Sequence, residues 1–281
     1  MNDILIAAAW FLGIGGILGL LLAIAAKLFF VKEDERIGKI TSCLPGANCG
    51  GCGYPGCAGY AKAVVENGEK TNKCVAGGDE ASGKISEIMG VKSEQSERYR
   101  AQVMCSGTDG IASKKYILDG VSDCFAATRL SGGDKMCPNG CVGLGTCAKV
   151  CNFDAISVVD GVAVVDYEKC KACGACVDAC PKGIIKLIPF DSKYWVGCMS
   201  VDKGAKTHSY CKVGCISCRL CEKNCPTDAI HVENFVAHID YNKCIGCGEC
   251  EKNCPRHIIK SAYTQKKEQT ENAEEKEETA D

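Results

Sequence analysis

The sequence has few aromatic residues, few histidines and a small net charge. Each of these features argues against a class of protein. Phe, Trp and Tyr make up only 6% of the 281 residues, so no large aromatic core is available. The four histidines show no metal-ligand spacing, and no P-loop, dinucleotide fingerprint or paired nucleophile and base occurs. A formal net charge of −2 argues against a nucleic-acid partner. On its own, the chain is therefore not expected to transfer hydride.

Cysteine is what the sequence has in abundance, with 25 residues, an odd number. A content this high is typical of a disulfide scaffold or of a metal protein. Disulfides need an oxidising compartment, and no small-residue cleavage site follows the apolar N-terminal segment. Clustered C-x-x-C runs in a reducing compartment indicate metal ligands. We therefore expect metal clusters to supply much of the folding energy.

Between Cys137 and Pro255 the ligand spacing of bacterial ferredoxins recurs. Three complete copies of C-x2-C-x2-C-x3-C-P end at Pro181, Pro226 and Pro255, and a modified fourth copy ends at Cys151. In such runs three thiolates hold one 4Fe–4S cluster and the fourth reaches the neighbouring cluster. The short loops turn sulfurs and backbone N–H groups towards one centre, and the proline stops the following helix. Zinc sites also use single C-x-x-C pairs, but three full runs with proline favour iron–sulfur clusters.

The region from Cys124 onward repeats itself with an offset of 74 residues and without gaps. The matches include Asp154-Ala-Ile with Asp228-Ala-Ile, in addition to the cysteines. A repeat of this kind identifies the structural unit, so we predict two tandem ferredoxin-like modules, over residues 124–190 and 191–263. In each module two apolar runs are expected to pair as a hairpin that walls the clusters from water. The predicted hairpins join residues 155–159 to 161–165 and residues 230–232 to 236–239.

One departure from the repeat affects the ligand assignment. Position 144 is Leu where the second module has Cys218, so we assign the missing thiolate to Cys137, and its equivalent Cys211 is then spare. The crossover rule predicts four sets: Cys137, Cys141, Cys147 and Cys180; Cys170, Cys173, Cys176 and Cys151; Cys215, Cys218, Cys221 and Cys254; and Cys244, Cys247, Cys250 and Cys225.

A second type of four-thiolate site precedes the modules. It is glycine-rich, its cysteines are separated by two, four and sixteen residues, and they are Cys49, Cys52, Cys57 and Cys74. The glycines permit a tight loop whose backbone amides face the sulfurs. We predict a small domain over residues 32–90, with helices at 58–70 and 83–90, and a linker over 91–123. Zinc is the alternative occupant of this site.

With this site the predicted total is five 4Fe–4S clusters and 20 ligands. The cysteines left over are Cys43, Cys105, Cys124, Cys198 and Cys211. They are expected to be buried inert thiols, or alternatively to supply a sixth cluster.

The N-terminal segment is long and apolar. Ile4 to Ala26 are 23 consecutive uncharged, mostly apolar residues, more than the roughly 20 that span a bilayer as a helix. A cleaved signal peptide is the alternative, but Asp3 precedes the run and no basic residue does. We therefore predict a single-pass anchor over residues 1–31. Basic residues follow the run, which places the cluster domains on the cytoplasmic side of the cell membrane. Residues 264–281 are predicted to be a disordered acidic tail.

An apolar N-terminal segment, a glycine-rich C-x2-C-x4-C-x16-C site and ferredoxin modules, in this order, resemble the B-subunit family of the Rnf complex. This complex is a membrane-bound, ion-translocating ferredoxin:NAD oxidoreductase, and the likeness covers essentially the whole chain except the tail. The resemblance implies a subunit that takes electrons from soluble reduced ferredoxin and relays them to other subunits of the complex. The resemblance also implies that NAD is reduced elsewhere in the complex. Na+ or H+ transport would occur elsewhere too, because the helix carries no ionisable residue between Ile4 and Lys27.

Two other functions are compatible with these residues. One is a polyferredoxin subunit of another membrane complex, such as a hydrogenase or dehydrogenase, although such subunits usually lack a site like Cys49–Cys74. The other is a membrane-anchored, zinc-binding interaction module. In each case the expected fold class is α+β, with an N-terminal transmembrane helix, a small cluster domain and two ferredoxin-like modules.

Overall fold

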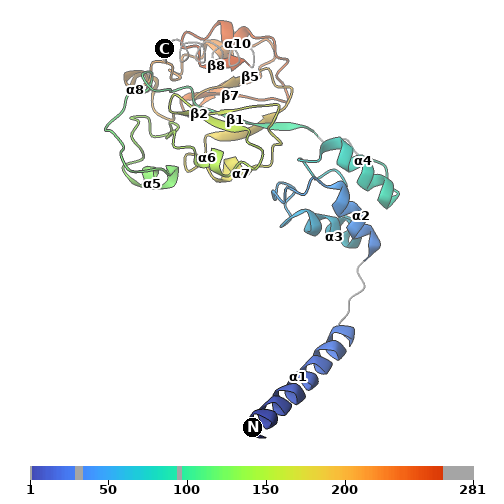
Figure 1. Ribbon diagram of the computed structural model, residues 1–281. Coiled ribbons are helices and arrows are strands. Elements are labelled where there is room, and N and C mark those ends of the chain that lie inside the picture. The colour runs from blue at the N-terminus through green and yellow to red at the C-terminus, as the bar shows by residue number, and fades with distance from the viewer. Residues whose placement is uncertain (1, 29–33, 94–96, 262–281) are drawn as a thin grey trace, which may run out of the picture.

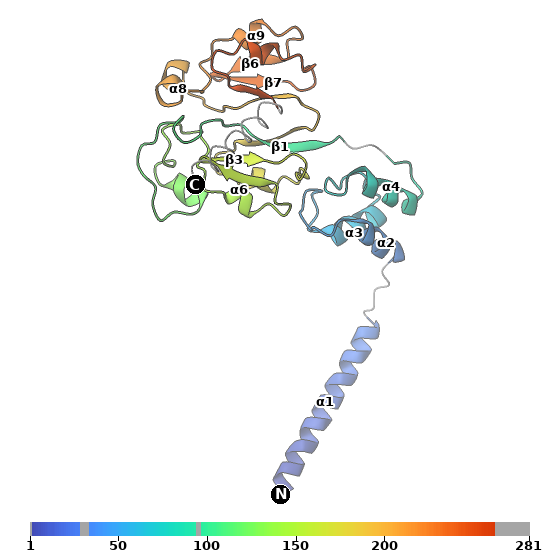
Figure 2. The same ribbon diagram turned by 45° about the horizontal axis from the view of Figure 1, so that its top comes forward.

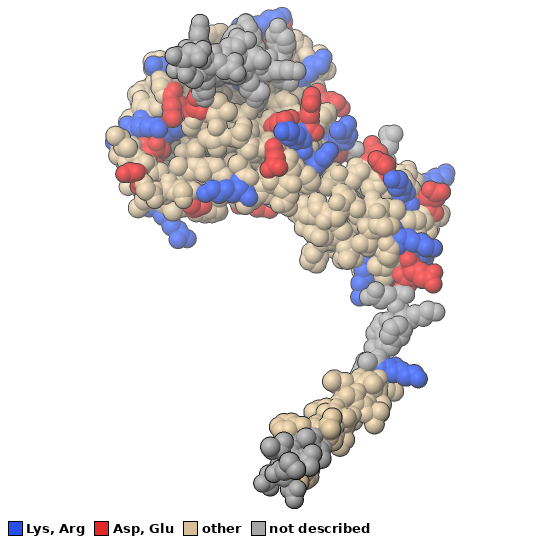
Figure 3. Space-filling view, viewed as in Figure 1, with Lys and Arg blue, Asp and Glu red and all other residues tan. Residues whose placement is uncertain are grey.

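A computed structural model describes residues 2–28, 34–93 and 97–261 of the chain (Figure 1). In chain order it contains one long helix, a small helical domain, and a larger region of short strands and helices. The predicted acidic tail at 264–281 lies outside the described residues. Positive and negative side chains are interspersed over the face shown in Figure 3, which presents no large area of one sign.

The long helix is α1, Asn2–Leu28, and it stands apart from the other elements (Figures 1 and 2). Over the residues that the structure describes, no helix has the combined length and apolar character of a membrane span. The predicted N-terminal helix is present as α1. Its predicted role as a membrane anchor is not confirmed.

The small domain packs three helices, α2 (Glu35–Cys43), α3 (Cys57–Asn67) and α4 (Gly78–Met89). Their shared core consists of apolar side chains that are fully buried, namely Ile40, Tyr60, Val64 and Ile85. This core positions the loop between α2 and α3, which carries Cys49 and Cys52, and the start of α3, which carries Cys57.

The two helices predicted in this domain are present with different ends. The helix predicted at 58–70 is α3, which ends at Asn67 because Gly68 takes a left-handed φ of 64°. The helix predicted at 83–90 is α4, which begins earlier, at Gly78, and is closed by Gly90 with a φ of 67°.

The larger region contains four antiparallel, two-stranded sheets. Their strand pairs are β1 (Tyr99–Val103) with β4 (Ile185–Pro189), β2 (Ile156–Val159) with β3 (Val162–Val165), β5 (Tyr194–Val196) with β8 (Ile259–Ser261), and β6 (Ile230–Glu233) with β7 (Val236–Ile239). Each module thus has one hairpin and one sheet that joins its first strand to its last. The short helices between them are α5 (Cys124–Arg129), α6 (Thr146–Lys149), α7 (Ala175–Asp178), α8 (Gly204–Tyr210), α9 (Leu220–Lys223) and α10 (Glu249–Lys252).

Both predicted hairpins are confirmed, as β2–β3 and β6–β7. Their turns adopt the same conformation, with positive φ at both central residues. In the first turn these are Asp160 (48°) and Gly161 (72°), and in the second Asn234 (47°) and Phe235 (65°). This is the geometry whose twist matches that of the flanking strands. The second module achieves it with a bulky residue where the first has glycine.

The predicted linker over 91–123 differs from the structure, because it contains β1. Four of the five residues of β1 are buried, and the strand pairs with β4 from Tyr99–Pro189 to Val103–Ile185. Burial on both faces removes the alternating polar pattern of a half-exposed strand, and the partner strand lies far along the chain. The first module therefore begins at β1, earlier than predicted.

Beyond β1 the chain packs against the second module. Ser106 N–H donates to the Gly197 carbonyl at 2.9 Å, and Ser113 N–H donates to the Tyr210 carbonyl at 2.8 Å. Figure 2 shows the second module, with α8, α9, β6 and β7, on one side of β1 and the first module on the other. The two modules are thus joined along this segment.

A buried arginine lies where the two modules meet. Arg100 is only 1% exposed, and its guanidinium carbon lies 3.9 Å from the ring centroid of Tyr167 and 5.3 Å from that of Trp195. Its nitrogens donate to Gln102 Oε1 at 2.7 Å and to the Ser192 carbonyl at 2.9 Å. Stacking on aromatic faces and donation to carbonyl groups are the contacts that let this cation be buried.

Candidate metal centres

The glycine-rich site forms a single cavity in the small domain, with about 330 Å³ of empty space. All four predicted ligands line it: Cys49, Cys52, Cys57 and Cys74. The side-chain oxygen of Asn48 accepts the Cys57 N–H at 2.8 Å and so fixes the loop onto the start of α3. The Gly77 N–H donates to Cys74 Sγ at 3.3 Å, a contact that stabilises thiolate charge.

In the first module a cavity with about 380 Å³ of empty space is lined by Cys124, Cys141, Cys147 and Cys180. Three of these belong to the predicted set. The fourth member differs, because Cys124 occupies the position predicted for Cys137. Cys137 instead lines a separate cavity between the modules.

Cys124 reaches the other three because the start of α5 is fixed to the start of α6. Its N–H donates to Thr146 Oγ1 at 2.8 Å, and the Thr146 hydroxyl donates to Asp123 Oδ2 at 3.0 Å. Asp123 also caps α5 by accepting the Ala126 N–H at 3.0 Å. The contact between Cys124 and Thr146 joins two segments that lie far apart in the sequence, so the spacing of a short cysteine motif could not predict it.

In each module we call the set that contains Cys141 or Cys215 the inner set, and the other set the outer set. The second module brings its predicted inner set together. A cavity with about 330 Å³ of empty space is lined by Cys215, Cys218, Cys221 and Cys254. Cys218 therefore stands where Cys124 stands in the first module. This leaves Cys198, the equivalent of Cys124 at the 74-residue offset, outside the set.

The second set of the first module is grouped around Cys176. Burial, and after it the sulfurs of Cys170, Cys173, Cys147 and Cys151, together raise the pKa of the Cys176 thiol to about 12. The influence of Cys170, Cys173 and Cys151 agrees with the predicted set. Cys147 belongs to the other set of the same module, so the two sets are neighbours.

The corresponding set in the second module shows the same pattern. Burial raises the pKa of the Cys250 thiol to about 11, with Cys244 and Cys247 adding to the effect. The fourth predicted member, Cys225, packs against the same core cluster as Cys250.

Backbone amides point at the crossover cysteines in both modules. The Ala155 N–H donates to Cys151 Sγ at 3.4 Å, and the equivalent Ala229 N–H donates to Cys225 Sγ at 3.2 Å. Burial raises the pKa of Cys225, but amides of Ala229 and Thr227 outweigh it and lower the pKa below its ordinary value. A thiolate is the form that binds iron, so these amides favour ligation.

These sites fit four-iron clusters in the chemistry of their donors. Each of the three cavities described above is lined by four cysteines. Within the described part of the chain, no three His, Cys, Asp or Glu side chains lie close enough to share one metal ion. A 4Fe–4S cluster has eight atoms and takes four cysteine ligands around it, which is the number of cysteines that line each of these cavities.

Repeated hairpins, sulfur-lined cavities and amide donors together define a multicluster iron–sulfur protein of the ferredoxin class. Comparison with protein families agrees. A family model described as an Fe-S cluster matches residues 44–76, a 4Fe-4S binding domain matches residues 163–186, and a 4Fe-4S dicluster domain matches residues 214–259.

Known proteins similar to the chain are components of membrane ion-translocating complexes. The B subunit of the Na(+)-translocating ferredoxin:NAD(+) oxidoreductase complex of Acetobacterium woodii is 43% identical, over 86% of this chain and 73% of the relative. The B subunit of an ion-translocating oxidoreductase complex of Methanosarcina acetivorans is 41% identical, over 86% of this chain and 93% of the relative. That of the proton-translocating complex of Clostridium ljungdahlii is 38% identical, over 85% of each chain. The chain belongs to this family, the B subunits of Rnf-type ion-translocating ferredoxin:NAD(+) oxidoreductase complexes.

Sequence reasoning missed two functional features of these sites. It leaves Cys124 unassigned, although the match of this residue to Cys198 in the repeat is visible. It places Arg100 in a linker, and only the buried strand shows that Arg100 lies beside the Cys170 set, where the Ala101 N–H donates to Cys170 Sγ at 3.4 Å.

Proposed function

We propose that this chain takes electrons from reduced soluble ferredoxin and relays them, through 4Fe–4S clusters, to other subunits of its complex. Bound clusters would supply reversible one-electron chemistry. NAD reduction and Na+ or H+ transport would belong to other subunits. The observation that carries the proposal is that the cysteine sets adjoin one another as a continuous series.

The first link of the series joins the small domain to the first module. Gly51, between Cys49 and Cys52, packs on the backbone of Cys173: a Cβ at Gly51 would lie 2.9 Å from Cys173 Cα. Burial raises the pKa of the Cys173 thiol, and the nearby sulfur of Cys49 contributes to the same increase. Electrons could therefore pass directly between these two sets.

The second link lies within each module, and in the second module Cys221 of one set and Cys250 of the other pack in the same core cluster. In the first module the sulfur of Cys147, from the inner set, raises the pKa of the Cys176 thiol, from the outer set. The third link joins the modules at Arg100, which contacts Tyr167, three residues before Cys170. Arg100 and Cys244 also act in opposite directions on the pKa of Tyr241, which burial raises to about 12.

We assign five ligand sets on this basis, with Cys124 in place of Cys137 in the first module. We also propose that α1 anchors the chain in the cell membrane, with the cluster domains on the cytoplasmic side. The 23-residue uncharged run supports this role. The anchor would hold the clusters near the membrane subunits that receive the electrons.

The test is oxidation of reduced ferredoxin by the full-length, anaerobically purified chain. We expect the paramagnetic signal of reduced ferredoxin to fall while new 4Fe–4S signals appear on the chain. A Cys173→Ala/Cys176→Ala variant should slow this transfer, whereas a Cys43→Ala control should not. If the chain holds clusters that dithionite reduces but ferredoxin does not, the donor is a different molecule and the proposal fails.

A further inference from the structure

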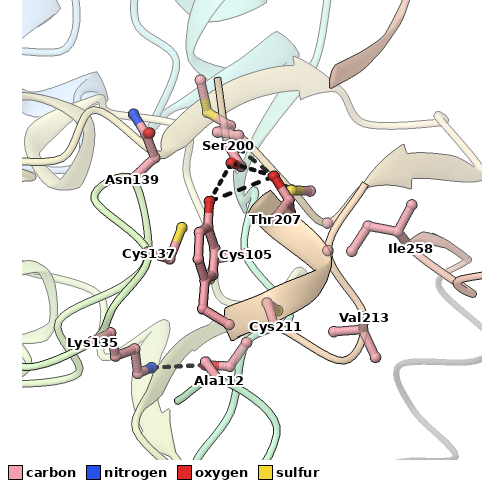
Figure 4. Close-up of a pocket in the computed structure, with 17 residues that line it drawn as sticks. Cys105, Ala112, Lys135, Cys137, Asn139, Ser200, Thr207, Cys211, Val213 and Ile258 are labelled. Atoms are coloured by element: carbon pink, nitrogen blue, oxygen red, sulfur yellow. Dashed lines mark hydrogen bonds between the residues drawn. The ribbon is translucent and has the colours of Figure 1, made fainter. Parts of the chain in front are cut away.

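Four cysteines outside the five assigned sets meet in one cavity between the modules (Figure 4). The cavity has about 390 Å³ of empty space, part of it open to solvent. Its cysteines are Cys105, Cys137, Cys198 and Cys211. We infer that these four hold a sixth 4Fe–4S cluster, which lies between the two modules. The inference rests on the proposed cluster chemistry of the chain.

The four cysteines reach this cavity in two equivalent pairs. Cys105 follows the end of β1 by two residues, and Cys198 follows the end of β5 by two residues. Cys137 and Cys211 are related by the 74-residue repeat. Each module thus contributes one cysteine after its first strand and one before its inner set. The duplication therefore creates a four-thiol site that neither module has alone.

Each of the four sulfurs receives at least one backbone amide. The Cys141 N–H donates to Cys105 Sγ at 3.4 Å, and the Cys215 and Ser200 N–H groups donate to Cys198 Sγ at 3.5 Å each. The remaining donors are Asn139 N–H to Cys137, and Val213 and Gly214 N–H to Cys211.

The amide two residues after the cysteine recurs among these contacts, at Cys137, Cys198 and Cys211. The same contact is present at assigned ligands, for example from Ala172 N–H to Cys170 Sγ at 3.5 Å. Amide donors of this kind stabilise the charge of thiolates bound to iron. The cavity cysteines therefore have the local geometry of ligands.

Inert packing does not account for this arrangement. Buried thiols that serve as small apolar side chains fill space in a close-packed core. Here the four thiols instead line one cavity, together with polar groups. Asn139, also in the wall, has a buried side-chain oxygen without a hydrogen-bond partner in the described structure. An amide can be turned to present its NH2 group, which could donate to a sulfur or sulfide in this cavity.

The wall also carries fixed polar groups. Ser200 Oγ lies 2.9 Å from the Tyr210 hydroxyl and 3.1 Å from Thr207 Oγ1, and all three side chains are buried (Figure 4). The Tyr210 hydroxyl also bonds to the Cys137 sulfur. Lys135 is 3% exposed and donates to the Gly107 carbonyl at 2.7 Å. Its positive charge would offset part of the negative charge of a thiolate-bound cluster.

The site adjoins a ligand set in each module. Cys141, whose amide bonds to Cys105, belongs to the inner set of the first module, and Cys215, whose amide bonds to Cys198, belongs to that of the second. A cluster here would therefore link the two inner sets. Six sets use 24 of the 25 cysteines and leave only Cys43.

The test is the iron and acid-labile sulfide content of the full-length chain, purified anaerobically and reconstituted. We expect about 24 iron atoms per chain with matching sulfide, four for each of six clusters. A Cys105→Ala/Cys211→Ala variant should lose about four iron atoms and four sulfides, because neither residue belongs to another set. The Cys43→Ala control should retain the full content.

A wild-type content of about 20 iron atoms would overturn the sixth site and leave the relay proposal intact. Retention of all the iron by the double variant would overturn it as well. If the double variant fails to fold and loses iron throughout, the wild-type count decides. Failure of ferredoxin to reduce a chain that holds about 24 iron atoms would reject the relay proposal and not this site.

Discussion

Gly51 lies directly against the backbone of Cys173. A Cβ at Gly51 would meet Cys173 Cα at 2.9 Å and the Cys173 carbonyl oxygen at 3.0 Å, closer than a side chain normally approaches backbone. These residues belong to cysteine sets of two different domains. Glycine here allows the small domain and the first module to come into close contact, as the proposed relay requires.

We expect Gly51→Ala to slow electron transfer from the small domain to the first module, because the added methyl group forces the domains apart. Iron content should not change, since Gly51 supplies no ligand. Freeze-quench paramagnetic resonance of the partly reduced chain measures this transfer. Gly83→Ala in α4 is the matched control, because a Cβ there meets nothing within 4 Å. Equal transfer rates in the two variants would show that the contact does not limit the relay.

Arg100 is expected to raise the reduction potential of the nearby clusters. A reduced cluster carries one more negative charge, which a buried cation stabilises. Arg100→Gln should therefore lower the potential of the Cys170-set cluster, by a shift on the order of 60 mV, equivalent to about 1.4 kcal/mol.

Arg98→Gln is the control for this change. Arg98 is exposed and stacks on Phe190 at 4.4 Å, so water and salt screen its charge. Redox titration followed by paramagnetic resonance gives both potentials. If Arg98→Gln shifts the potential as much as Arg100→Gln, burial at the module junction is not the cause.

The two hairpin turns should respond differently to alanine. Gly161→Ala places a Cβ on a residue with a φ of 72°, at 2.7 Å from Asp109 Oδ1. We therefore expect the free energy of unfolding to fall by about 1–2 kcal/mol. Phe235→Ala, at the equivalent position, creates no new backbone strain, because Phe235 already has a φ of 65°. Its side chain is 44% exposed, so the loss should be smaller. Anaerobic guanidinium unfolding of the cluster-loaded chain ranks the two variants, and the reverse order would contradict the argument.

The ligand set of the first module can be tested by paired substitutions. If Cys137 and Cys141 belong to different clusters, Cys137→Ala/Cys141→Ala should lose about eight iron atoms. Cys124→Ala/Cys141→Ala should lose about four, because both residues line one cavity. Iron analysis with matching sulfide distinguishes the variants. A loss of about four from both would instead place Cys137 with Cys141, as the sequence spacing alone predicts.

Features encoded by nearby residues could be predicted from the sequence. The hairpins are predictable because apolar runs flank a short turn, and α3 because it lies between ligands of the same site. Strand β1 was missed because Ala101 and Gln102 are both buried, which hides the alternation of a strand, and because its partner β4 lies far along the chain.

The cysteine ligands likewise fall into those that local spacing predicts and those that depend on contacts between distant segments. Spacing groups the cysteines within one C-x2-C-x2-C run, and the loop itself brings them together in the structure. Cys124 and Cys105 come from outside the runs, and their places depend on α5 and β1. Contacts between distant segments position them, such as the Cys124 amide on Thr146, and spacing carries no record of such contacts.

The most direct test of the account is the number of electrons that one chain accepts. Coulometric titration of the full-length chain under anaerobic conditions, followed by paramagnetic resonance, should show uptake of about one electron for each 4Fe–4S cluster. Six clusters would accept about six electrons per chain, and their reduced-state signals should disappear when the other subunits are added and reoxidise the clusters. A chain that accepts no electrons, or that holds zinc without sulfide, would contradict the central claim that this subunit is an electron relay.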